Sequence, residues 1–291
     1  MDYARYLTLT KYEDKRSEEN MIHTIKAPVA IDIHSHFNHG SPYDEHGQIA
    51  DEIHNREMDF IKAAYDHIGI HAAGISTFGS VLHPVCTVEE NQYLYELAAK
   101  EDWVYQWVVI DPRQPETYRQ AEEMLKSPKT LGIKIQPVSQ EYDIREYADA
   151  LFSFAAEHKA FVLMHPQHIM AMPAYADRYP DMKLILAHLG SLGHVEAIAA
   201  AKHGNIYTDT SGGASNLNNI VEYAVSRIGS EKIFFGTDTY SCAFQYGRIA
   251  LSTLSDEDKE NILYKNAMCH FPNAFQKLCS LFTAERTADN T

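Results

Sequence analysis

Cysteine is scarce in this sequence, and its four copies stand far from one another. No two of them have the CxxC spacing of a zinc knuckle or a redox pair. Their separation also argues against a disulfide framework, which is typical of small secreted domains. The pattern favours reduced, structural thiols in a cytosolic protein. The four residues are Cys86, Cys242, Cys269 and Cys279.

Positive charge and long apolar runs are also in short supply. The 25 lysines and arginines face 40 aspartates and glutamates, which leaves a formal net charge of -15. With no basic run to offset repulsion by phosphates, this charge argues against a nucleic-acid partner. No stretch approaches the roughly 18 apolar residues of a membrane helix. We therefore expect a cytoplasmic protein whose partner is a small molecule.

A repeated alternation of strand and helix patterns fills most of the chain. Eight short apolar, β-branched runs alternate with longer amphipathic stretches, which is typical of a parallel sheet. The amphipathic stretches include EMDFIKAAYDHI, VEENQYLYELAAK and YADALFSFAAEH. The predicted strands are residues 28–32, 71–76, 103–110, 131–135, 160–164, 183–187, 205–209 and 232–236.

A closed (β/α)8 barrel contains eight strands, each followed by a helix, and this sequence shows that number. An open doubly wound sheet would carry a glycine-rich phosphate turn after its first strand, but HSHFNHGSPYDEHG stands there. The sequence therefore predicts an α/β fold with a single (β/α)8 TIM barrel over residues 28–283. We expect residues 1–27 to be an N-terminal extension, with Met21 as an alternative start, and residues 284–291 to be a disordered tail.

Histidine is abundant, with 16 copies, and it is the commonest metal ligand in proteins. In a barrel, functional side chains gather where strands end. The predicted strand ends carry a ring of metal-ligating and acid–base side chains. They are His34 and His36, Asp111, Lys134 with Gln136, His165, His188, Asp209 and Asp238.

His34 and His36 are separated by one residue, so both side chains point to the same face of an extended strand. Two imidazoles from one strand can occupy two sites of a zinc ion. The alternative is a polar strand end that faces solvent. His165 and His188 each follow an apolar strand and, taken singly, could be buried structural histidines, but their arrival at the same rim as the pair favours a shared site.

Asp238 and Lys134 complete the predicted site. Asp238 can hold a metal with one oxygen while the other takes a proton, although it could instead cap the following helix. Lys134 lies inside the apolar run LGIKI, where an ammonium group needs a partner. It is either a carboxylated metal bridge, a clamp for an anionic substrate, or a lysine that extends outward between helices.

The motifs IDIHSH, GIKIQP, MHP, LAHLG and FGTD occur in this order, and with them the chain resembles the amidohydrolase superfamily. It is most similar to the branch that includes aminocarboxymuconate-semialdehyde decarboxylase-like proteins and metal-dependent hydrolases. The resemblance covers about residues 29–282, and NILYKNAMCHF is similar to the closing helix of that branch. The match is specific for the superfamily and not for a substrate.

The resemblance implies a ligand set and roles for its neighbours. His34, His36, His165 and Asp238 would hold one zinc ion, and His188 would assist catalysis by holding the water or the substrate. Binuclear relatives add a carboxylated lysine at the position of Lys134, so a second metal, held through Lys134 and His188, is the alternative. Manganese, iron or cobalt would also suit these ligands.

The leading functional hypothesis is hydrolysis of a C–O or C–N bond in a small, anionic substrate by a metal-activated water. Asp238 would transfer the proton to the leaving group. Lys134, Gln136 and Arg248 would bind the substrate. The alternative is metal-dependent, non-oxidative decarboxylation of an aromatic or enoic acid, and a third hypothesis is a catalytically inactive binding barrel. The many tyrosines and phenylalanines make a homodimer plausible.

Overall fold

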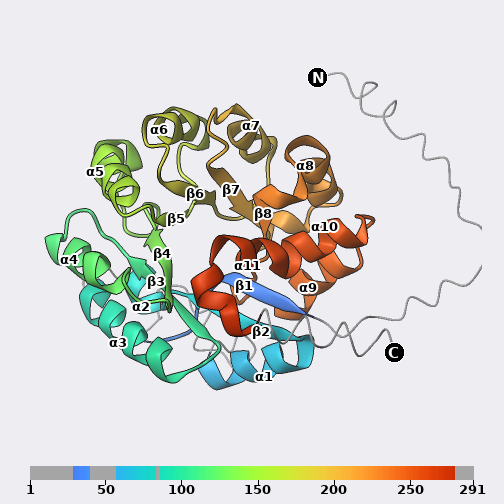
Figure 1. Cartoon of the computed structure of the whole chain (residues 1–291), viewed down its shortest axis with the longest axis horizontal. Coiled ribbons are helices and arrows are strands. Elements are labelled where there is room, and N and C mark those ends of the chain that lie inside the picture. Colours follow the sequence, from blue (N-terminus) through green and yellow to red (C-terminus); the bar gives the residue numbers. More distant parts are fainter. Residues whose placement is uncertain (1–28, 40–56, 83–85, 279–291) are drawn as a thin grey trace, which may run out of the picture.

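Eight parallel strands form one sheet whose spatial order follows the chain from β1 to β8. The computed structural model describes residues 29–39, 57–82 and 86–278, and the eight strands lie within these ranges. They occupy the centre of the molecule (Figure 1). Their bounds are β1 (Ala30–Ser35), β2 (Ile70–Ile75), β3 (Val104–Val109), β4 (Thr130–Ile135), β5 (Phe161–Met164), β6 (Lys183–Leu186), β7 (Ile206–Asp209) and β8 (Ile233–Phe234).

The last strand meets the first through backbone hydrogen bonds. The amide of Ile33 donates to the carbonyl oxygen of Phe235, just past the end of β8, over 2.9 Å. The amides of Thr237 and Asp238 donate to the carbonyl oxygen of His34 at 3.2 and 2.8 Å. These bonds bring both ends of the sheet together. The chain is a single (β/α)8 barrel, and the predicted fold class is confirmed.

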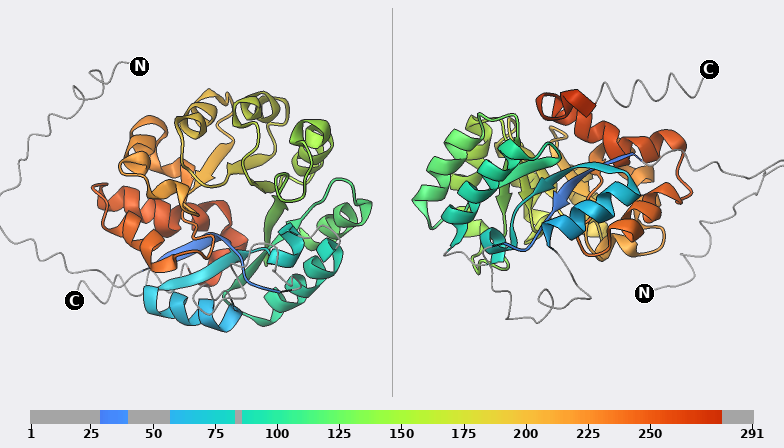
Figure 2. Two further views of the ribbon diagram at one scale, coloured as in Figure 1. Left: turned by 180° about the vertical axis from the view of Figure 1, so that it is seen from behind. Right: turned by 90° about the horizontal axis from the view of Figure 1, so that it is seen from below.

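Helices surround the sheet, and the turned views in Figure 2 show them on its outer side. The α-helices are α1 (Met58–Ile68), α2 (Phe78–Leu82), α3 (Thr87–Lys100), α4 (Pro115–Met124), α5 (Ile144–Glu157), α6 (Met172–Arg178), α7 (Leu192–Ala200), α8 (Ile220–Ile228), α9 (Cys242–Ala250), α10 (Asp256–Glu260) and α11 (Asn266–His270). Shorter turns are η4 (Ile169–Ala171), η5 (Ala214–Asn216), η6 (Ser230–Lys232) and the π-helical η7 (Asn261–Lys265).

The eight predicted strands agree with the observed ones to within a few residues at each end. A helix was expected after each strand, and α6 and α9 stand in two of these positions. Helix α6 has only seven residues and carries a proline in its first turn, where proline is well tolerated. The predicted extension at residues 1–27 and the predicted tail at residues 284–291 lie outside the described residues.

Trp107 fills the barrel interior and depends on two glycines. Its indole is fully buried, and its Nε1 donates to the carbonyl oxygen of Ile33 at 2.6 Å. A Cβ atom at Gly74 or at Gly132, on the strands that flank β3, would lie 2.7 Å from the indole. Only glycine therefore leaves room for this side chain, which packs β1, β2, β3 and β4 against one another.

Aromatic rings close the end of the barrel at which the strands begin. The ring of Phe161 lies 5.9 Å from that of Tyr207 and 4.6 Å from that of Phe271, measured between centroids. His270, at the end of α11, lies 5.5 Å from Phe234. Residues 270 and 271, at the end of α11, thus help to cover the pole where the strands begin. The predicted functional residues lie at the other pole, where the strands end.

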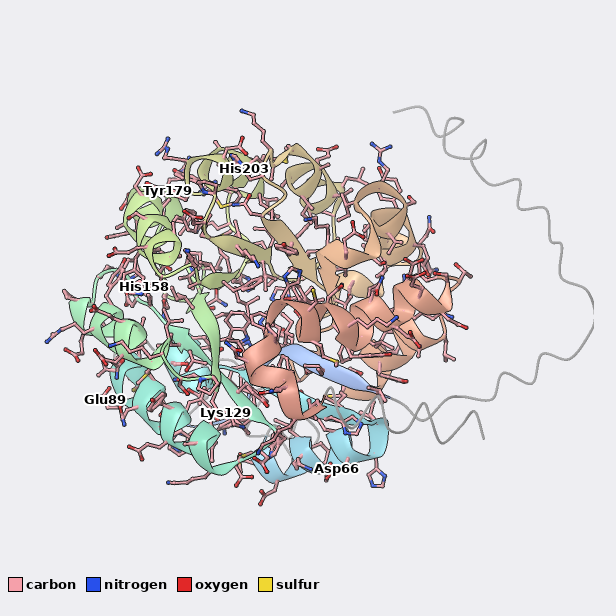
Figure 3. The ribbon with its side chains drawn as sticks, viewed as in Figure 1. Asp66, Glu89, Lys129, His158, Tyr179 and His203 are labelled. Carbon is pink, nitrogen blue, oxygen red and sulfur yellow. The ribbon has the colours of Figure 1, made fainter. Side chains whose placement is uncertain are left out.

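Polar side chains occupy the outer surface of the helices. Asp66 on α1 and Glu89 on α3 are exposed, and Figure 3 shows them at the periphery together with His203. His158 is the residue that caps the C-terminal end of α5, and it is half-buried. Across the described ranges, no helix combines the length and the apolar character needed to cross a membrane.

Replacement of Gly132 by alanine tests the packing around Trp107. The added Cβ would lie 2.4 Å from the carbonyl oxygen of Phe161 and 2.7 Å from the indole. Because neither neighbour can move freely, we expect Gly132→Ala to lower the free energy of unfolding by about 1–3 kcal/mol. Urea denaturation, followed by circular dichroism, measures this change.

Gly193→Ala is the matched control. Gly193 lies in α7, and its added Cβ would meet no heavy atom closer than 3.5 Å. Alanine favours a helix over glycine, so this variant should keep or gain stability by up to about 1 kcal/mol. If the free energy of unfolding fell equally in both variants, the indole of Trp107 would not require the space at Gly132.

Candidate metal centre

Seven titratable side chains gather where the strands end. His34 lies in β1 and His36 directly after it, Lys134 lies near the end of β4, and Asp209 is the last residue of β7. The other three follow β5, β6 and β8. These are His165, His188 and Asp238. The barrel therefore brings together, at one pole, residues that are up to about two hundred positions apart in the chain.

Acceptors on the outer side fix the rings of the two β1 histidines. Nδ1 of His34 lies 2.9 Å from Oδ2 of Asp209, and Nδ1 of His36 lies 2.7 Å from the carbonyl oxygen of Ser76. Each Nδ1 must carry the proton to donate to its acceptor, so each Nε2 keeps its lone pair. Both Nε2 atoms therefore face the interior of the site, as metal-ligating imidazoles do.

His188 is oriented in the same way. Its Nδ1 lies 2.9 Å from Oγ of Ser211 and 3.3 Å from the carbonyl oxygen of Ser211, so Nδ1 is the donor. Its Nε2 lies 3.2 Å from Nδ1 of His165. His165 thus reaches the cluster through His188, and it does not belong to the group of three whose ligand atoms all lie within 4.8 Å of one another.

That group of three consists of His34, His36 and Asp238. Oδ1 of Asp238 lies 3.2 Å from Nε2 of His36 and 3.7 Å from Nε2 of His34. Nζ of Lys134 lies 2.8 Å from Nε2 of His34. Lys134 therefore points into the cluster, and not outward between the helices. Two imidazole nitrogens and a carboxylate oxygen, held this close, suit a divalent metal ion.

A second close group contains His34, His188 and Asp209, but its centre is filled. The hydroxyl of Ser211 lies 2.9 Å from Nδ1 of both His34 and His188, and it also donates to Oδ1 of Asp209. The amides of His188 and Ser211 donate to the same carboxylate oxygen at 3.1 and 2.9 Å. This group is a hydrogen-bonded support layer that adjoins the group of His34, His36 and Asp238.

Burial sets the charge of the cluster. It lowers the pKa of His34 to about 3, with the charge of Lys134 acting in the same direction. Burial and the neighbouring His188 lower the pKa of His165 to about 3. Burial also lowers the pKa of Lys134 to about 8. The imidazoles of His34 and His165 are thus neutral at physiological pH, which is the form that binds a metal ion.

The carboxylate of Asp238 keeps its charge. Burial alone would raise its pKa, but the hydrogen bond with His36 and the fields of His188 and His34 hold the pKa below its usual range. The candidate site therefore combines imidazole nitrogens with an ionised carboxylate oxygen.

The backbone at the site is held in an unfavourable conformation. His188 and Asp238 have φ angles of 63° and 57°, in the left-handed region that non-glycine residues seldom adopt. Such strain persists where surrounding structure imposes it, and it concentrates at functional sites. Gly212, with a φ of 68°, supplies the space, because a Cβ there would lie 2.9 Å from Nδ1 of His188.

Asp32 supports the cluster from beneath. Its carboxylate accepts hydrogen bonds from the amides of His34 and Thr237 at 2.9 and 3.1 Å, and from the hydroxyls of Thr237 and Tyr65 at 2.5 Å each. Burial nevertheless raises the pKa of Asp32 to about 7. Through these bonds one buried side chain connects β1 to the segment that carries Asp238.

Two residues that were expected to bind the substrate, Arg248 and Gln136, differ in what surrounds them. The guanidinium of Arg248 forms two hydrogen bonds, of 3.0 and 2.7 Å, with the carboxylate of Glu222, which ties α9 to α8. None of its described contacts reaches the histidine cluster, so the expected role in substrate binding has no support. Gln136 is buried, and its Oε1 has no hydrogen-bond partner among the described residues.

Asp209 was predicted to lie at the end of a strand, but no role was predicted for it. Its carboxylate lies against Nδ1 of His34 and accepts from the hydroxyl of Ser211, and nothing in the residue type distinguishes an aspartate that binds a metal from one that holds a histidine. Asp111, another noted strand end, accepts two hydrogen bonds of 2.9 Å from Arg113 and one of 3.1 Å from Gln114. It belongs to a separate polar cluster.

Apolar side chains are exposed around the same pole. Six of the nine large apolar residues exposed in the described ranges lie in the segments that follow β4 to β8, before or within the first turn of the next helix. Exposed apolar groups at such a rim are typical of a binding surface. The six are Val138, Met170, Leu192, Leu217, Tyr240 and Phe244.

The family model described as Amidohydrolase matches residues 31–271, which is most of the chain. The chain belongs to the amidohydrolase family. The family identified from the ordered strand-end motifs is thus confirmed. This amidohydrolase is a metal-dependent enzyme of that superfamily, with both hydrolases and decarboxylases among the proteins to which it is similar.

A curated relative, L-fucono-1,5-lactonase from Burkholderia ambifaria, is 25% identical to this amidohydrolase over an alignment of 149 residues, and the match covers 45% of this chain and 51% of that protein. The chain thus spans about half the length of the curated relative it matches.

Two solved structures resemble the fold across most of the chain. One is a dihydroxybenzoic acid decarboxylase from Polaromonas sp. JS666, with bound manganese and the inhibitor 2-nitroresorcinol. Its TM-score is 0.67 at 17% identity, over 84% of this chain and 97% of that one. The other, from Pseudomonas putida, is assigned as a 2-pyrone-4,6-dicarboxylic acid hydrolase, with a TM-score of 0.61 at 13% identity, over 84% and 98% of the two chains. At these identities the likeness shows the fold alone.

Replacement of Asp209 by asparagine tests the support layer. The variant keeps the shape of the side chain but loses the charge that holds Nδ1 of His34 at 2.9 Å. Loss of such a partner typically weakens metal binding about 10- to 100-fold, and we expect a change of this size. Competition with a chelator measures the affinity for zinc and for manganese.

Asp111→Asn is the control, because Asp111 is an equally buried strand-end aspartate that bonds to Arg113 instead of a histidine. Its metal affinity should stay unchanged. If Asp209→Asn also bound metal with unchanged affinity, Asp209 would not orient His34.

Proposed function

We propose that this amidohydrolase hydrolyses a C–O or C–N bond in a small, anionic substrate, with a lactone or ester as the first class to test. The observation that carries this proposal is the environment of Asp238. Its Oδ1 faces Nε2 of His36 and of His34, whereas its Oδ2 has no hydrogen-bond partner among the described residues. One oxygen is thus suited to hold an ion, and the other is free to take a proton.

The donor set fits a divalent metal ion. His34, His36 and Asp238 would hold it, with His165 and His188 as the remaining nitrogen donors. When bound, such an ion supplies Lewis acidity, which polarises a substrate oxygen and lowers the pKa of a water molecule. We propose one tightly bound ion, and zinc or manganese both suit nitrogen and carboxylate ligands.

The residues of the site can move the proton that hydrolysis requires. Oδ2 of Asp238 would accept a proton from the attacking water, whose oxygen forms a bond with the acyl carbon. The same oxygen would then return the proton to the leaving oxygen or nitrogen as that bond breaks. His188, whose Nδ1 is held by Ser211, would orient the water or the substrate carbonyl with its Nε2.

The surroundings indicate the kind of substrate. Lys134 is a buried cation inside the cluster, so we propose that it contacts an anionic group when it is not a metal bridge. Gln136, with its free Oε1, offers a hydrogen-bond acceptor nearby on the same strand end. The apolar side chains at the rim favour a substrate that also has an apolar or ring-shaped body.

The similar proteins support two reactions. The names of the lactonase and of the Pseudomonas putida protein are those of hydrolases, and they support hydrolysis of a cyclic ester. The decarboxylase from Polaromonas supports the alternative, non-oxidative loss of carbon dioxide from an aromatic acid. That reaction needs an acid that delivers a proton to carbon, whereas the depressed pKa of Asp238 keeps its carboxylate ionised, so that it can accept a proton but holds none to deliver.

A substrate panel separates the two reactions. We expect the purified enzyme, reconstituted with zinc or manganese, to open sugar lactones or pyrone lactones in heavy-oxygen water, with one labelled oxygen in each product. Asp238→Asn should lower kcat about 10²- to 10⁴-fold, the usual contribution of a general base. Removal of the metal with a chelator should abolish turnover, and returning the ion should restore it.

Dihydroxybenzoates and related aromatic acids form the second arm of the same panel. If these acids released carbon dioxide and their products contained no labelled oxygen, the enzyme would be a decarboxylase and the proposed hydrolysis would be wrong. An enzyme that binds no metal after supplementation with zinc and manganese would contradict both reactions.

Lys134→Ala tests the number of metal ions. If Lys134 bridges two ions as a carboxylated side chain, the variant should bind one ion where the parent binds two. If Lys134 contacts the substrate, both proteins should bind one ion, and KM for an anionic substrate should rise about tenfold or more because a charged contact is lost. Elemental analysis with protein quantification measures the stoichiometry. An unchanged stoichiometry with an unchanged KM would leave Lys134 without either role.

A further inference from the structure

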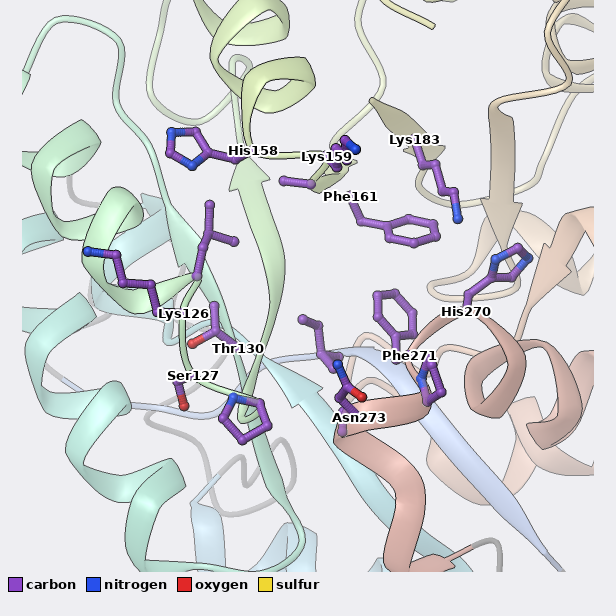
Figure 4. A pocket seen from close by; sticks show the side chains of 16 residues that line it. Lys126, Ser127, Thr130, His158, Lys159, Phe161, Lys183, His270, Phe271 and Asn273 are labelled. Carbon is purple, nitrogen blue, oxygen red and sulfur yellow. The ribbon is translucent and has the colours of Figure 1, made fainter. Parts of the chain in front are cut away.

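A cavity of about 450 Å³ lies at the opposite pole of the barrel, where the strands begin. Figure 4 shows its two walls. One wall carries Lys126, in the connection between α4 and β4, and Thr130, at the start of β4. The other carries Phe161 at the start of β5, Lys183 at the start of β6, and His270 at the end of α11. Its size falls within the range of about 300–1,000 Å³ that is typical of small-molecule sites.

The charge of the cavity is opposite to that of the chain. No aspartate or glutamate lines it, whereas three lysines and two histidines do. The whole chain has a formal net charge of -15, so a lining without one carboxylate departs strongly from the average surface. A concave surface with charges of one sign concentrates the field and attracts ions of the opposite sign.

Two of the lysines are available to a ligand. Lys126 is paired with Glu123 at 2.8 Å. Within the described ranges, Lys159 and Lys183 form no ion pair with a carboxylate. The ammonium group of Lys183 instead lies 4.9 Å from the ring centroid of Phe161. Two cations without an anionic partner thus border the cavity.

A histidine at the edge of the cavity is affected by this positive field. Burial, and then the charges of Lys183 and Lys232, lower the pKa of His270 to about 4. His270 is therefore neutral at physiological pH, and with Phe161 and Phe271 it forms a wall of flat rings. Flat rings beside cations suit a ligand that is itself flat and negatively charged.

The cavity is separate from the metal centre. Phe161 begins β5, and His165 follows the end of that strand, so the two sites lie at opposite ends of it, about 13 Å apart along the chain direction. Between them stand the buried side chains of the barrel core. A ligand in the cavity cannot be the substrate of the metal centre at the same time.

We propose that this cavity is a second binding site, which takes a small organic anion with an oxyanion group on a flat, aromatic body. Lys159 and Lys183 bind the oxyanion, and Phe161 and Phe271 contact the ring. The site does not depend on the proposed hydrolysis, because none of its residues belongs to the metal centre.

Phenyl phosphate is the probe, because it combines a flat ring with a strong oxyanion. Isothermal titration calorimetry on the full, metal-loaded chain should show binding that weakens as salt is added. Lys159→Gln/Lys183→Gln should weaken that binding about tenfold or more, since two charge-assisted contacts are lost. Inorganic phosphate, which lacks the ring, should bind at least several-fold more weakly.

Lys202→Gln is the matched control, because it removes the same charge from an exposed lysine beside Asp177, outside the cavity. It should bind phenyl phosphate like the parent. Lys183→Arg, which keeps the charge, should retain most of the affinity, and thermal melting verifies that each variant is folded.

Removal of the metal separates the two sites. Binding that survives chelation, and is weakened only by the cavity variants, supports the proposal. Absence of binding, or binding that is lost with the metal and is indifferent to Lys159 and Lys183, would overturn it. Equal binding of inorganic phosphate and phenyl phosphate would also contradict the aromatic part of the site.

Discussion

The whole site depends on the junction between the first and the last strand, and one buried carboxylate holds that junction. Asp32 accepts hydrogen bonds from the amides of both His34 and Thr237, and from the hydroxyl of Tyr65 on α1. A fully buried carboxylate would be very costly without such donors. Because His34 lies in β1, His36 directly follows it and Asp238 follows β8, these candidate ligands meet only if this junction is closed.

The fold could be predicted because each of its signals is local. A buried parallel strand reads as a short apolar run, and eight such runs, separated by amphipathic stretches, leave few alternatives to a barrel. The strand ends then indicate the residues that share one pole. His34, Lys134 and Asp238 were identified in this way before any distance was known.

The details of the site could not be predicted, because they depend on side-chain orientation. Asp209 orients His34 and Arg248 pairs with Glu222, yet both residue types would be equally suited to bind a ligand. Which acceptor a charged side chain finds is decided by packing between elements distant in sequence. The cavity beside Lys183 has the same origin, since its walls come from the α4–β4 connection, β4, β5, β6 and α11.

The three histidines with outward acceptors have one further consequence. Asp209, Ser76 and Ser211 hold the rings in place through hydrogen bonds that form within the folded chain itself. The conformational entropy of the ligands is therefore lost when the barrel folds, and not when the ion arrives. The candidate metal centre is thus preorganised, and the positions of the strands set the distances between its candidate ligand atoms. Discrimination between ions of different radius then resides in the barrel itself, unlike in domains that fold only around their metal.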